Sequence, residues 1–245
     1  MSQPASRLNC ATCPIRDRAV CSSCDADEMA LLEQMKYYRH YEAGQVIRWA
    51  QDEMAFVASV VKGVATLSQT LQDGRTQMLG LLLPSDFIGR PGRQRSPYDV
   101  TAISDVTLCC FQRKPFEQLM ITNPHVAERL LAMTLDELDA AREWMLVLGR
   151  KSAREKTASF LVILARRAIP ATPTPHTGPT IVELFLTRAA MADYLGLTLE
   201  TVSRQLSALK AAGVIVMDGK RRVVIPVLRH LLQQTGDDTD AGFGG

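Results

Sequence analysis

Residues 197–209 read LTLETVSRQLSAL and form two faces when placed on one helix. With Thr198 as the N-cap, an apolar face at helical spacing consists of Leu199, Val202, Leu206 and Leu209. The other face is too polar for a protein core and consists of Glu200, Ser203, Arg204 and Ser207. Just upstream, Ala192, Gly196 and Val202 have the spacing that lets two helices cross closely around a short turn. The stretch therefore predicts a helix-turn-helix.

The polar face of this predicted helix has the chemistry for reading bases in a DNA major groove. Arg204 can donate two hydrogen bonds to the edge of a guanine, and Glu200, one helical turn away, can accept one from a cytosine amino group. An amphipathic surface helix whose charges are merely solvated is the alternative interpretation. Because turn, N-cap and polar face coincide, we favour a recognition helix for double-stranded DNA. Its expected DNA-binding residues are Thr198, Glu200, Ser203, Arg204 and Ser207.

The sequence VIVMDGKRRVVIPV at 214–227 predicts a β-hairpin after the recognition helix. Apolar runs at 214–217 and 223–225 flank Asp218-Gly219, which is a signal for a type I′ turn. The turn is crowded by three cations, Lys220, Arg221 and Arg222. In a winged helix such a hairpin lies against the DNA backbone, where cations add affinity without sequence information. The alternative is a basic hairpin tip that is simply solvated.

The basic charge of the chain is concentrated in the same region. Residues 150–245 contain 13 Lys and Arg against 8 Asp and Glu, a net charge of +5, whereas residues 1–149 contain 15 against 18, a net charge of −3. This asymmetry agrees with an electrostatic footprint for nucleic acid.

Length and composition set the broad class of the protein. The 245-residue chain is 47% hydrophobic and can bury one large or two moderate cores. It has no apolar run of roughly 18 residues, so we expect no membrane span. Its first residues lack the apolar stretch of a signal peptide, so we expect a cytoplasmic protein. We find no nucleophile elbow, Walker loop or dinucleotide fingerprint, which argues against an enzyme.

The six cysteines are not expected to form disulfides in a cytoplasmic chain. Four of them crowd into CATCPIRDRAVCSSC at 10–24, and the other two are the adjacent pair Cys109-Cys110. This clustering indicates a metal site. Zinc ribbons normally leave about a dozen or more residues between two Cys-x2-Cys pairs. Here only seven intervene, which favours a 4Fe-4S cluster over zinc. Redox-active thiols without a metal are the third alternative.

The middle of the chain changes from a strand pattern to a helix pattern. Short apolar segments separated by turns at 41–112 predict a small β-barrel or jelly roll. No Gly or Pro interrupts the sequence between Pro124 and Gly149, where we expect a long helix to end. An apolar stripe repeats every seven residues at Leu131, Leu138 and Met145, and it is widened by Leu135, Ala141 and Leu148. Such a seam is suited to pairing with a second copy, and the alternative is a helix packed only on its own barrel.

The C-terminal third is predicted to continue as a small domain. A second helix is expected at 153–167, and the proline-rich AIPATPTPHTGPT at 168–180 is expected to be a surface loop. After the hairpin, a short helix to Gln234 leads into TGDDTDAGFGG, which is acidic and Gly-rich and is predicted to be disordered.

Together these features resemble the CRP/FNR superfamily of transcription regulators, specifically its oxygen-sensing FNR branch. The motif that carries the resemblance is Glu-x2-Ser-Arg in the recognition helix, together with the cysteine cluster. The phrases YYR, FVASVVKG, LLLPSDFIGRPGR, TLDELDAAREWMLVLGRK and YLGLTLETVSRQ are similar to the FnrL-type regulators of purple photosynthetic bacteria. The resemblance covers nearly the whole chain.

The resemblance implies an α+β architecture with a cyclic-nucleotide-binding-like β-roll, a long dimerisation helix and a C-terminal winged helix-turn-helix. On this chain the parts are a cysteine-rich arm at 1–27, the β-roll at 28–120, the dimerisation helix at 121–149, the winged helix-turn-helix at 150–230 and a disordered tail at 231–245. It also implies a homodimer that binds two inverted TTGAT-like half-sites and controls anaerobic genes, with RNA polymerase as a further partner.

In FNR-like proteins, three cysteines of the arm and one of the β-roll hold an oxygen-labile 4Fe-4S cluster, whose presence favours the DNA-binding dimer. The matching residues here are Cys10, Cys13, Cys21 and Cys109. The Cys-x2-Cys-x7-Cys spacing departs from the best-known pattern, which has x5, and Cys24 is the alternative third ligand. Cys110 is expected to face the other side of the sheet, because side chains alternate along a strand.

Other signals are possible on the same fold. In cAMP-binding relatives a Phe-x-Gly-Glu phrase holds the ribose and an Arg-Ser pair holds the phosphate. Here Arg95-Ser96 is present, but Arg90 stands at the glutamate position, which argues against cAMP. Haem or nitric oxide sensing has no specially placed histidine to support it. An aspartate that repels its counterpart in the apo dimer of FNR-like proteins aligns with Ala141, and the nearby acidic residues are Glu137, Asp139 and Glu143.

Overall fold

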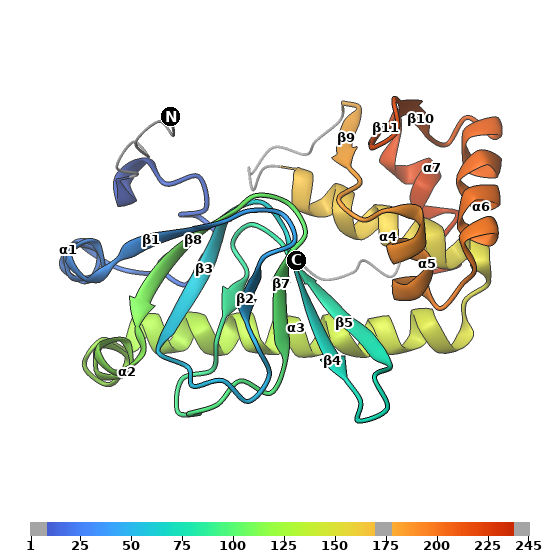
Figure 1. Cartoon of the computed structure of the whole chain (residues 1–245). Helices are drawn as coiled ribbons and strands as arrows, with labels where there is room; N and C mark the ends of the chain where they lie inside the picture. The colour runs from blue at the N-terminus through green and yellow to red at the C-terminus, as the bar shows by residue number, and fades with distance from the viewer. Residues whose placement is uncertain (1–8, 170–177, 238–245) are drawn as a thin grey trace, which may run out of the picture. The chain divides into compact units, whose positions relative to one another are not determined.

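The computed structural model describes residues 9–169 and 178–237. Most of the predicted proline-rich loop and the last residues of the predicted tail lie outside this range. The chain divides into two compact units, Met1–Glu137 and Leu138–Gly245. The long helix α3 (Pro124–Arg150) contributes residues to both units (Figure 1). Among the described helices, none combines the length and the apolar character needed to cross a bilayer.

The first unit contains two four-stranded antiparallel sheets (Figure 1). One sheet has the order β1-β8-β3-β6 and consists of Tyr37–Tyr41 (β1), Val106–Gln112 (β8), Phe56–Lys62 (β3) and Phe87–Ile88 (β6). The other has the order β2-β7-β4-β5 and consists of Val46–Arg48 (β2), Asp99–Ala102 (β7), Ala65–Thr70 (β4) and Thr76–Leu82 (β5). All of these strands except β1 lie within 41–112, where the sequence predicts short strands, which confirms the β-roll. Strand β1 was missed because YYRHY contains no aliphatic side chain.

Strands β3 and β8 lie in the middle of their sheet and are covered on both faces. Phe56 and Leu108 belong to the apolar cluster between the two sheets. Val57 and Phe111 belong to a second cluster on the outer face, together with Phe116 and residues of the N-terminal arm. Because both faces are buried, β3 is apolar at nearly every position rather than at every second one.

Two helices that the sequence did not indicate, α1 (Ala26–Met35) and α2 (Arg113–Thr122), help to form the outer cluster. Helix α1 begins with a capping box. The side chain of Asp25 accepts a hydrogen bond from the backbone N–H of Glu28, and the Glu28 carboxylate accepts one from the N–H of Asp25. Helix α2 follows β8 directly and buries Phe116 and Leu119. Helix α1 therefore begins inside the stretch, 1–27, that was expected to be only a cysteine-rich arm.

The second unit is a winged helix-turn-helix. Its elements are α4 (Ala153–Ala168), β9 (Thr180–Glu183), α5 (Arg188–Leu195), α6 (Leu199–Ala211), β10 (Val216–Asp218), β11 (Arg222–Ile225) and α7 (Leu228–Leu232). The predicted turn between α5 and α6 is confirmed. Gly196 adopts the left-handed conformation, with φ 61° and ψ 44°, and its N–H donates to the carbonyls of Ala192 and Asp193. The three strands form one sheet in the order β10-β11-β9.

The type I′ turn predicted at the tip of the wing is wrong. Asp218 pairs with Arg222 across the hairpin, which leaves a three-residue loop at 219–221. A type I′ turn needs a positive φ at both central residues, and here Gly219 has a φ of 74° while Asp218 remains in the strand. An ion pair of 3.2 Å between the Arg222 guanidinium and the Asp218 carboxylate closes the longer loop.

Two predicted ends are also wrong. The long helix continues through Gly149 to Arg150, since a glycine inside a helix costs only about 1 kcal/mol. The tail is ordered beyond residue 231 as far as it is described. Leu231 and Thr235 are buried, and the Asp237 carboxylate forms an ion pair of 2.6 Å with Lys151. The remainder of the predicted disordered tail lies outside the described residues.

Two glycines in turns of the β-roll provide a matched test of close backbone packing. Gly63 (φ 85°) and Gly74 (φ 87°) are both left-handed, but a Cβ on Gly63 would collide with the backbone carbonyl of Asp105, and one on Gly74 would meet no described atom within 4 Å. We expect Gly74→Ala to lower the free energy of unfolding by about 1–2 kcal/mol, the cost of the left-handed conformation. Gly63→Ala should lower it by about 3 kcal/mol or more, because backbone must move. Urea denaturation measures both losses, and equal losses would contradict the contact.

Candidate metal centre and nucleic-acid interface

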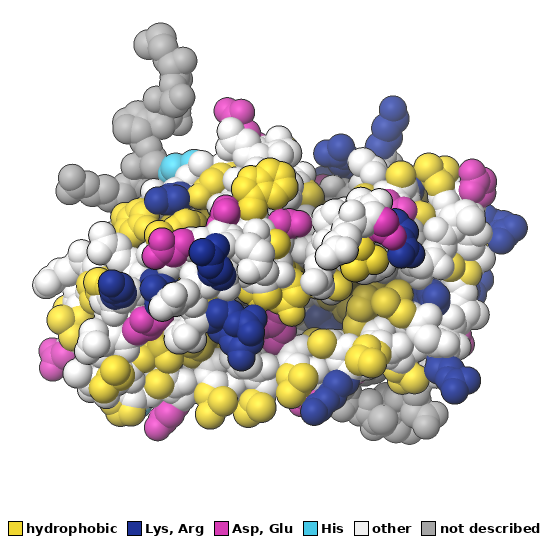
Figure 2. Space-filling model, turned by 60° about the horizontal axis from the view of Figure 1, so that its bottom comes forward, with side chains coloured by type: hydrophobic (Ala, Val, Ile, Leu, Met, Phe, Trp, Pro, Cys, Tyr) yellow, Lys and Arg dark blue, Asp and Glu magenta, His cyan; other side chains and the backbone are white. Residues whose placement is uncertain are grey.

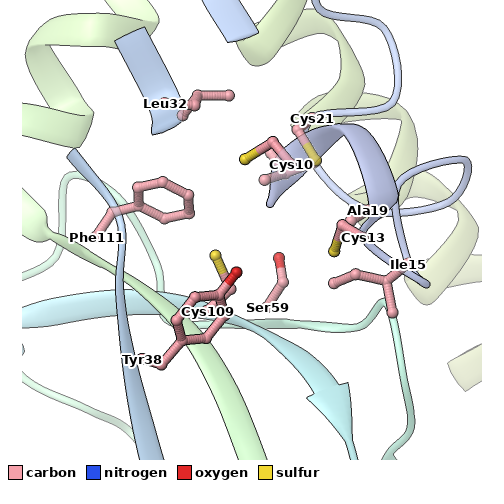
Figure 3. Close-up of a pocket in the computed structure, with 11 residues that line it drawn as sticks. Cys10, Cys13, Ile15, Ala19, Cys21, Leu32, Tyr38, Ser59, Cys109 and Phe111 are labelled. Atoms are coloured by element: carbon pink, nitrogen blue, oxygen red, sulfur yellow. The ribbon is translucent and has the colours of Figure 1, made fainter. Parts of the chain in front are cut away.

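Four of the six cysteines line a single pocket in the first unit (Figure 3). Cys10, Cys13 and Cys21 come from the N-terminal arm, and Cys109 comes from β8. Figure 3 shows their sulfur atoms directed toward the same space. The remaining lining is largely apolar and consists of Ile15, Ala19, Val20, Leu32, Tyr38, Ser59 and Phe111. These are the four cysteines that the family resemblance assigns to a cluster.

The other two cysteines do not line this pocket. Cys110 is fully buried in the apolar cluster between the two sheets, on the opposite face of β8 from Cys109. This is the alternation that the sequence predicts for adjacent strand residues. Cys24 packs at the edge of the outer apolar cluster, just before α1. All six thiols are free.

Strand register brings polar side chains to the pocket beside Cys109. In the sheet, Tyr38 of β1 and Ser59 of β3 are the two residues paired with Cys109. Because directly paired residues point to the same face, all three side chains reach the outer side of the sheet. The Ser59 hydroxyl is buried and has no hydrogen-bond partner among residues 9–169 and 178–237.

The arm is held over the sheet by polar contacts of its backbone. The N–H of Cys10 donates to the Glu33 carboxylate of α1 at 2.8 Å. Between Cys13 and Cys21, the carbonyl of Arg18 accepts a hydrogen bond of 2.7 Å from the Arg129 guanidinium, and the carbonyl of Ala19 accepts a longer one of 3.5 Å. Arg129 belongs to α3, so the long helix takes part directly in shaping the arm.

Burial governs the ionisation of these thiols. It raises the pKa of Cys10 to about 11, although the neighbouring Lys36 ammonium opposes the shift. Burial also raises the pKa of Cys21 and that of Cys109. Without a metal the thiols of Cys10, Cys21 and Cys109 are therefore protonated at neutral pH, and a metal that binds them must displace protons.

The donor set fits a group that takes several thiolates. Four soft sulfur donors in an apolar pocket suit an iron-sulfur cluster or zinc, and they do not suit Mg²⁺ or Ca²⁺, which prefer oxygen ligands. The unpartnered Ser59 hydroxyl is consistent with an additional acceptor in the pocket. A separate group of Asp25, Glu28 and His125 has ligand atoms close together, but these side chains already form the capping box of α1 and an ion pair of 3.0 Å.

In the second unit, α6 presents the polar face that the sequence predicts. Thr198 caps the helix, and its hydroxyl accepts a hydrogen bond of 3.2 Å from the N–H of Thr201. Val202, Leu206 and Leu209 are buried as expected. Leu199 is not part of this buried face, because its place in the first turn leaves it 45% exposed.

The side chains expected to read DNA are accessible. Glu200, Arg204 and Ser207 are exposed, and Ser203 is half-buried. Within the described part of the chain, neither Glu200 nor Arg204 forms a hydrogen bond or an ion pair, so both are available to a ligand. In the wing, Lys220 and Arg221 are exposed, and the Arg222 guanidinium is paired with the Asp218 carboxylate.

Large apolar side chains are exposed on α3 among exposed charged ones. Hydrophobic side chains lie at the surface of the molecule in Figure 2, and on α3 the large ones are Leu131, Leu135, Leu138, Met145 and Leu146. The predicted seven-residue stripe is therefore not covered by the rest of the described chain. Helix α3 buries Val126 and Val147 from other sides.

The chain was compared with known proteins. A cyclic nucleotide-binding domain matches residues 38–123, and a Crp-like helix-turn-helix domain matches residues 155–234. The transcriptional activator protein FnrL of Cereibacter sphaeroides is 63% identical over 96% of this chain and 94% of its own length. The chain belongs to the CRP/FNR family. The nitrogen fixation regulation protein FixK of Bradyrhizobium diazoefficiens is 37% identical over 85% of this chain and 86% of its own.

A solved structure agrees with this assignment. FixK2 from Bradyrhizobium japonicum superposes with a TM-score of 0.73 at 32% identity, covering 83% of this chain and 98% of its own. These CRP/FNR relatives are transcription regulators and not enzymes, as the sequence predicts. The chain is therefore a DNA-binding transcriptional activator whose contacts are made by the helix-turn-helix.

The two kinds of cation in the DNA-binding unit of this CRP/FNR regulator should behave differently. We expect Arg204→Ala to remove a bidentate contact to a guanine and to cost about 1–3 kcal/mol, with lost discrimination at that base pair. We expect Arg221→Ala to remove a contact to the DNA backbone, and so to weaken binding to all sequences alike and reduce the salt dependence. Fluorescence anisotropy on the operator and its single-base variants measures both. If Arg204→Ala lowers the affinity equally for every operator variant, Arg204 contacts a phosphate and not a base.

Proposed function

We propose that this CRP/FNR activator responds to oxygen through a 4Fe-4S cluster held by Cys10, Cys13, Cys21 and Cys109. The observation that carries the proposal is the convergence of these four thiols, three from the arm and one from β8, in one apolar pocket. In its loaded form the protein binds inverted TTGAT-like half-sites as a homodimer and controls anaerobic genes, with RNA polymerase as its partner at the promoter. It acts in the cytoplasm.

The cluster, when bound, supplies a centre that oxygen can destroy and joins the arm to the sheet. The chain's own residues provide the path from this centre to α3. The Arg129 guanidinium holds the arm backbone between Cys13 and Cys21, and His125, one turn earlier on α3, pairs with Glu28 of α1. If the link between Cys109 and the arm were lost, these contacts to the first turns of α3 would be weakened.

The exposed stripe on α3 supports the homodimer. Leu131, Leu138 and Met145 are 60%, 44% and 74% exposed, which is unusual for a regular seven-residue repeat of large apolar side chains. A helix that packed only on its own barrel would bury them. A second copy of the same helix covers such a stripe in a two-fold dimer.

A cyclic nucleotide is the second candidate signal, because the matching domain is named for that ligand. The polar groups expected to bind the nucleotide form hydrogen bonds within the protein instead. The Arg95 guanidinium donates to the Gln51 carbonyl at 2.8 Å, and the Ser96 hydroxyl donates to the Tyr98 carbonyl at 2.7 Å. Arg90 stands where an acidic group would hold the ribose. We therefore favour the cluster over the nucleotide, with zinc as the alternative metal.

Single replacements of the cysteines test the proposed cluster. Serine at position 10, 13, 21 or 109 should remove most of the iron and sulfide and abolish the anaerobic response. Cys24→Ser and Cys110→Ser are the controls and should leave most of both. Visible spectra with iron and sulfide analysis of anaerobically purified protein, before and after air, measure the effect. Loss of iron from Cys24→Ser but not from Cys21→Ser would show that Cys24, and not Cys21, is the third ligand. Tightly bound zinc without iron would contradict the oxygen-sensing role.

A charge on the stripe tests the dimer. Leu138→Glu places like charges opposite each other across the two-fold axis, so the variant should be a monomer even when it is fully loaded. Ile121→Glu is the control, because Ile121 is 76% exposed on α2 and lies outside the stripe. Sedimentation of the loaded proteins measures the outcome. A Leu138→Glu variant that still sediments as a dimer would show that the interface lies elsewhere.

A further inference from the structure

A buried lysine is fixed beside the thiol pocket. Lys36 is the C-cap residue of α1, and its side chain is only 7% exposed. Its ammonium group donates to Cys10 Sγ at 3.3 Å and to Glu33 Oε2 at 2.8 Å, and it lies over the Tyr38 ring, 5.5 Å from the ring centre. The same Glu33 carboxylate accepts the N–H of Cys10 at 2.8 Å. One N–H of Lys36 is thereby held on a sulfur atom rather than in solvent.

A buried hydroxyl reaches the pocket from its other wall. Ser59 lines the pocket on β3, next to Cys109 in the sheet, and its oxygen is directed into the same space as the sulfur atoms (Figure 3). It is 2% exposed, and its Oγ has no partner in the described chain. Leaving a buried hydroxyl without a hydrogen-bond partner is unfavourable, so the position of Ser59 is explained if the pocket holds an acceptor.

We propose that Lys36 and Ser59 are positioning residues that donate hydrogen bonds to sulfur at this site and raise the reduction potential of the bound cluster. This inference rests on the proposed function. Four thiolates bring negative charge into an apolar pocket, and donors to sulfur are a principal means by which a protein sets a cluster's potential. When the cluster takes up one electron, its negative charge increases and the two hydrogen bonds strengthen. Both donors therefore favour the reduced form.

The experiment compares reduction potentials of the full-length protein purified without air. Lys36→Met removes the donor and its charge, Lys36→Arg retains both, and Ser59→Ala removes the hydroxyl alone. The matched controls are Lys62→Met, at an exposed position on β3, and Ser68→Ala on β4, outside the pocket. Protein-film voltammetry measures the one-electron potential, with the electrode as electron donor. Iron and sulfide analysis measures loading.

We expect Lys36→Met and Ser59→Ala to shift the potential downward, and Lys36→Arg and both controls to keep the wild-type value. If Lys36→Met fails to retain iron while Lys36→Arg is loaded, the role of the Lys36 donor is supported. The effect on the reduction potential is then measured with Ser59→Ala. Unchanged potentials in loaded Lys36→Met and Ser59→Ala overturn the inference, as does an equal shift in Lys62→Met. Wild-type protein that contains no iron and sulfide would overturn the proposed function itself. That outcome is distinct from unchanged potentials in loaded variants, which overturn only this inference.

Discussion

Burial of both faces of the central strands β3 and β8 is the constraint on which the first unit depends. One face completes the roll, and the other receives the N-terminal arm with α1, α2 and the start of α3. Since neighbouring residues of a strand face opposite ways, Cys110 enters the roll and Cys109 faces the arm. A cysteine on β8 can therefore meet cysteines that lie about a hundred residues away in the chain.

The chemistry of the pocket follows from this burial. Thiols in apolar surroundings resist ionisation, and a group that binds them as thiolates needs compensating donors nearby. Lys36 and Ser59 occupy such positions, and Glu33 holds Lys36 in place. Arg129 adds a mechanical link, because its guanidinium connects the arm backbone to the helix that carries the exposed apolar stripe. The proposed sensing site and the proposed dimer surface thus share a helix.

The second unit depends on local geometry to a greater degree. The left-handed Gly196 sets the turn, and Thr198 caps the recognition helix whose polar face is exposed. The stacking of Trp144 on Tyr194, with ring centres 4.5 Å apart, packs the last part of α3 against α5 of the helix-turn-helix. The last part of α3 is therefore in direct contact with the helix that precedes the recognition helix.

The amino-acid sequence alone determined most of the elements of this protein, because apolar periodicity, N-caps and glycine turns act over a few residues. It indicated the short strands of the roll at 41–112, the long helix, the helix-turn-helix with its polar face and the clustered cysteines. Only the tertiary structure decided which thiols share a pocket, that Lys36, Ser59 and Arg129 adjoin it, and that the segment ending at Asp237 is ordered. These outcomes depend on strand register and on contacts between residues far apart in the chain, for which local patterns carry no signal.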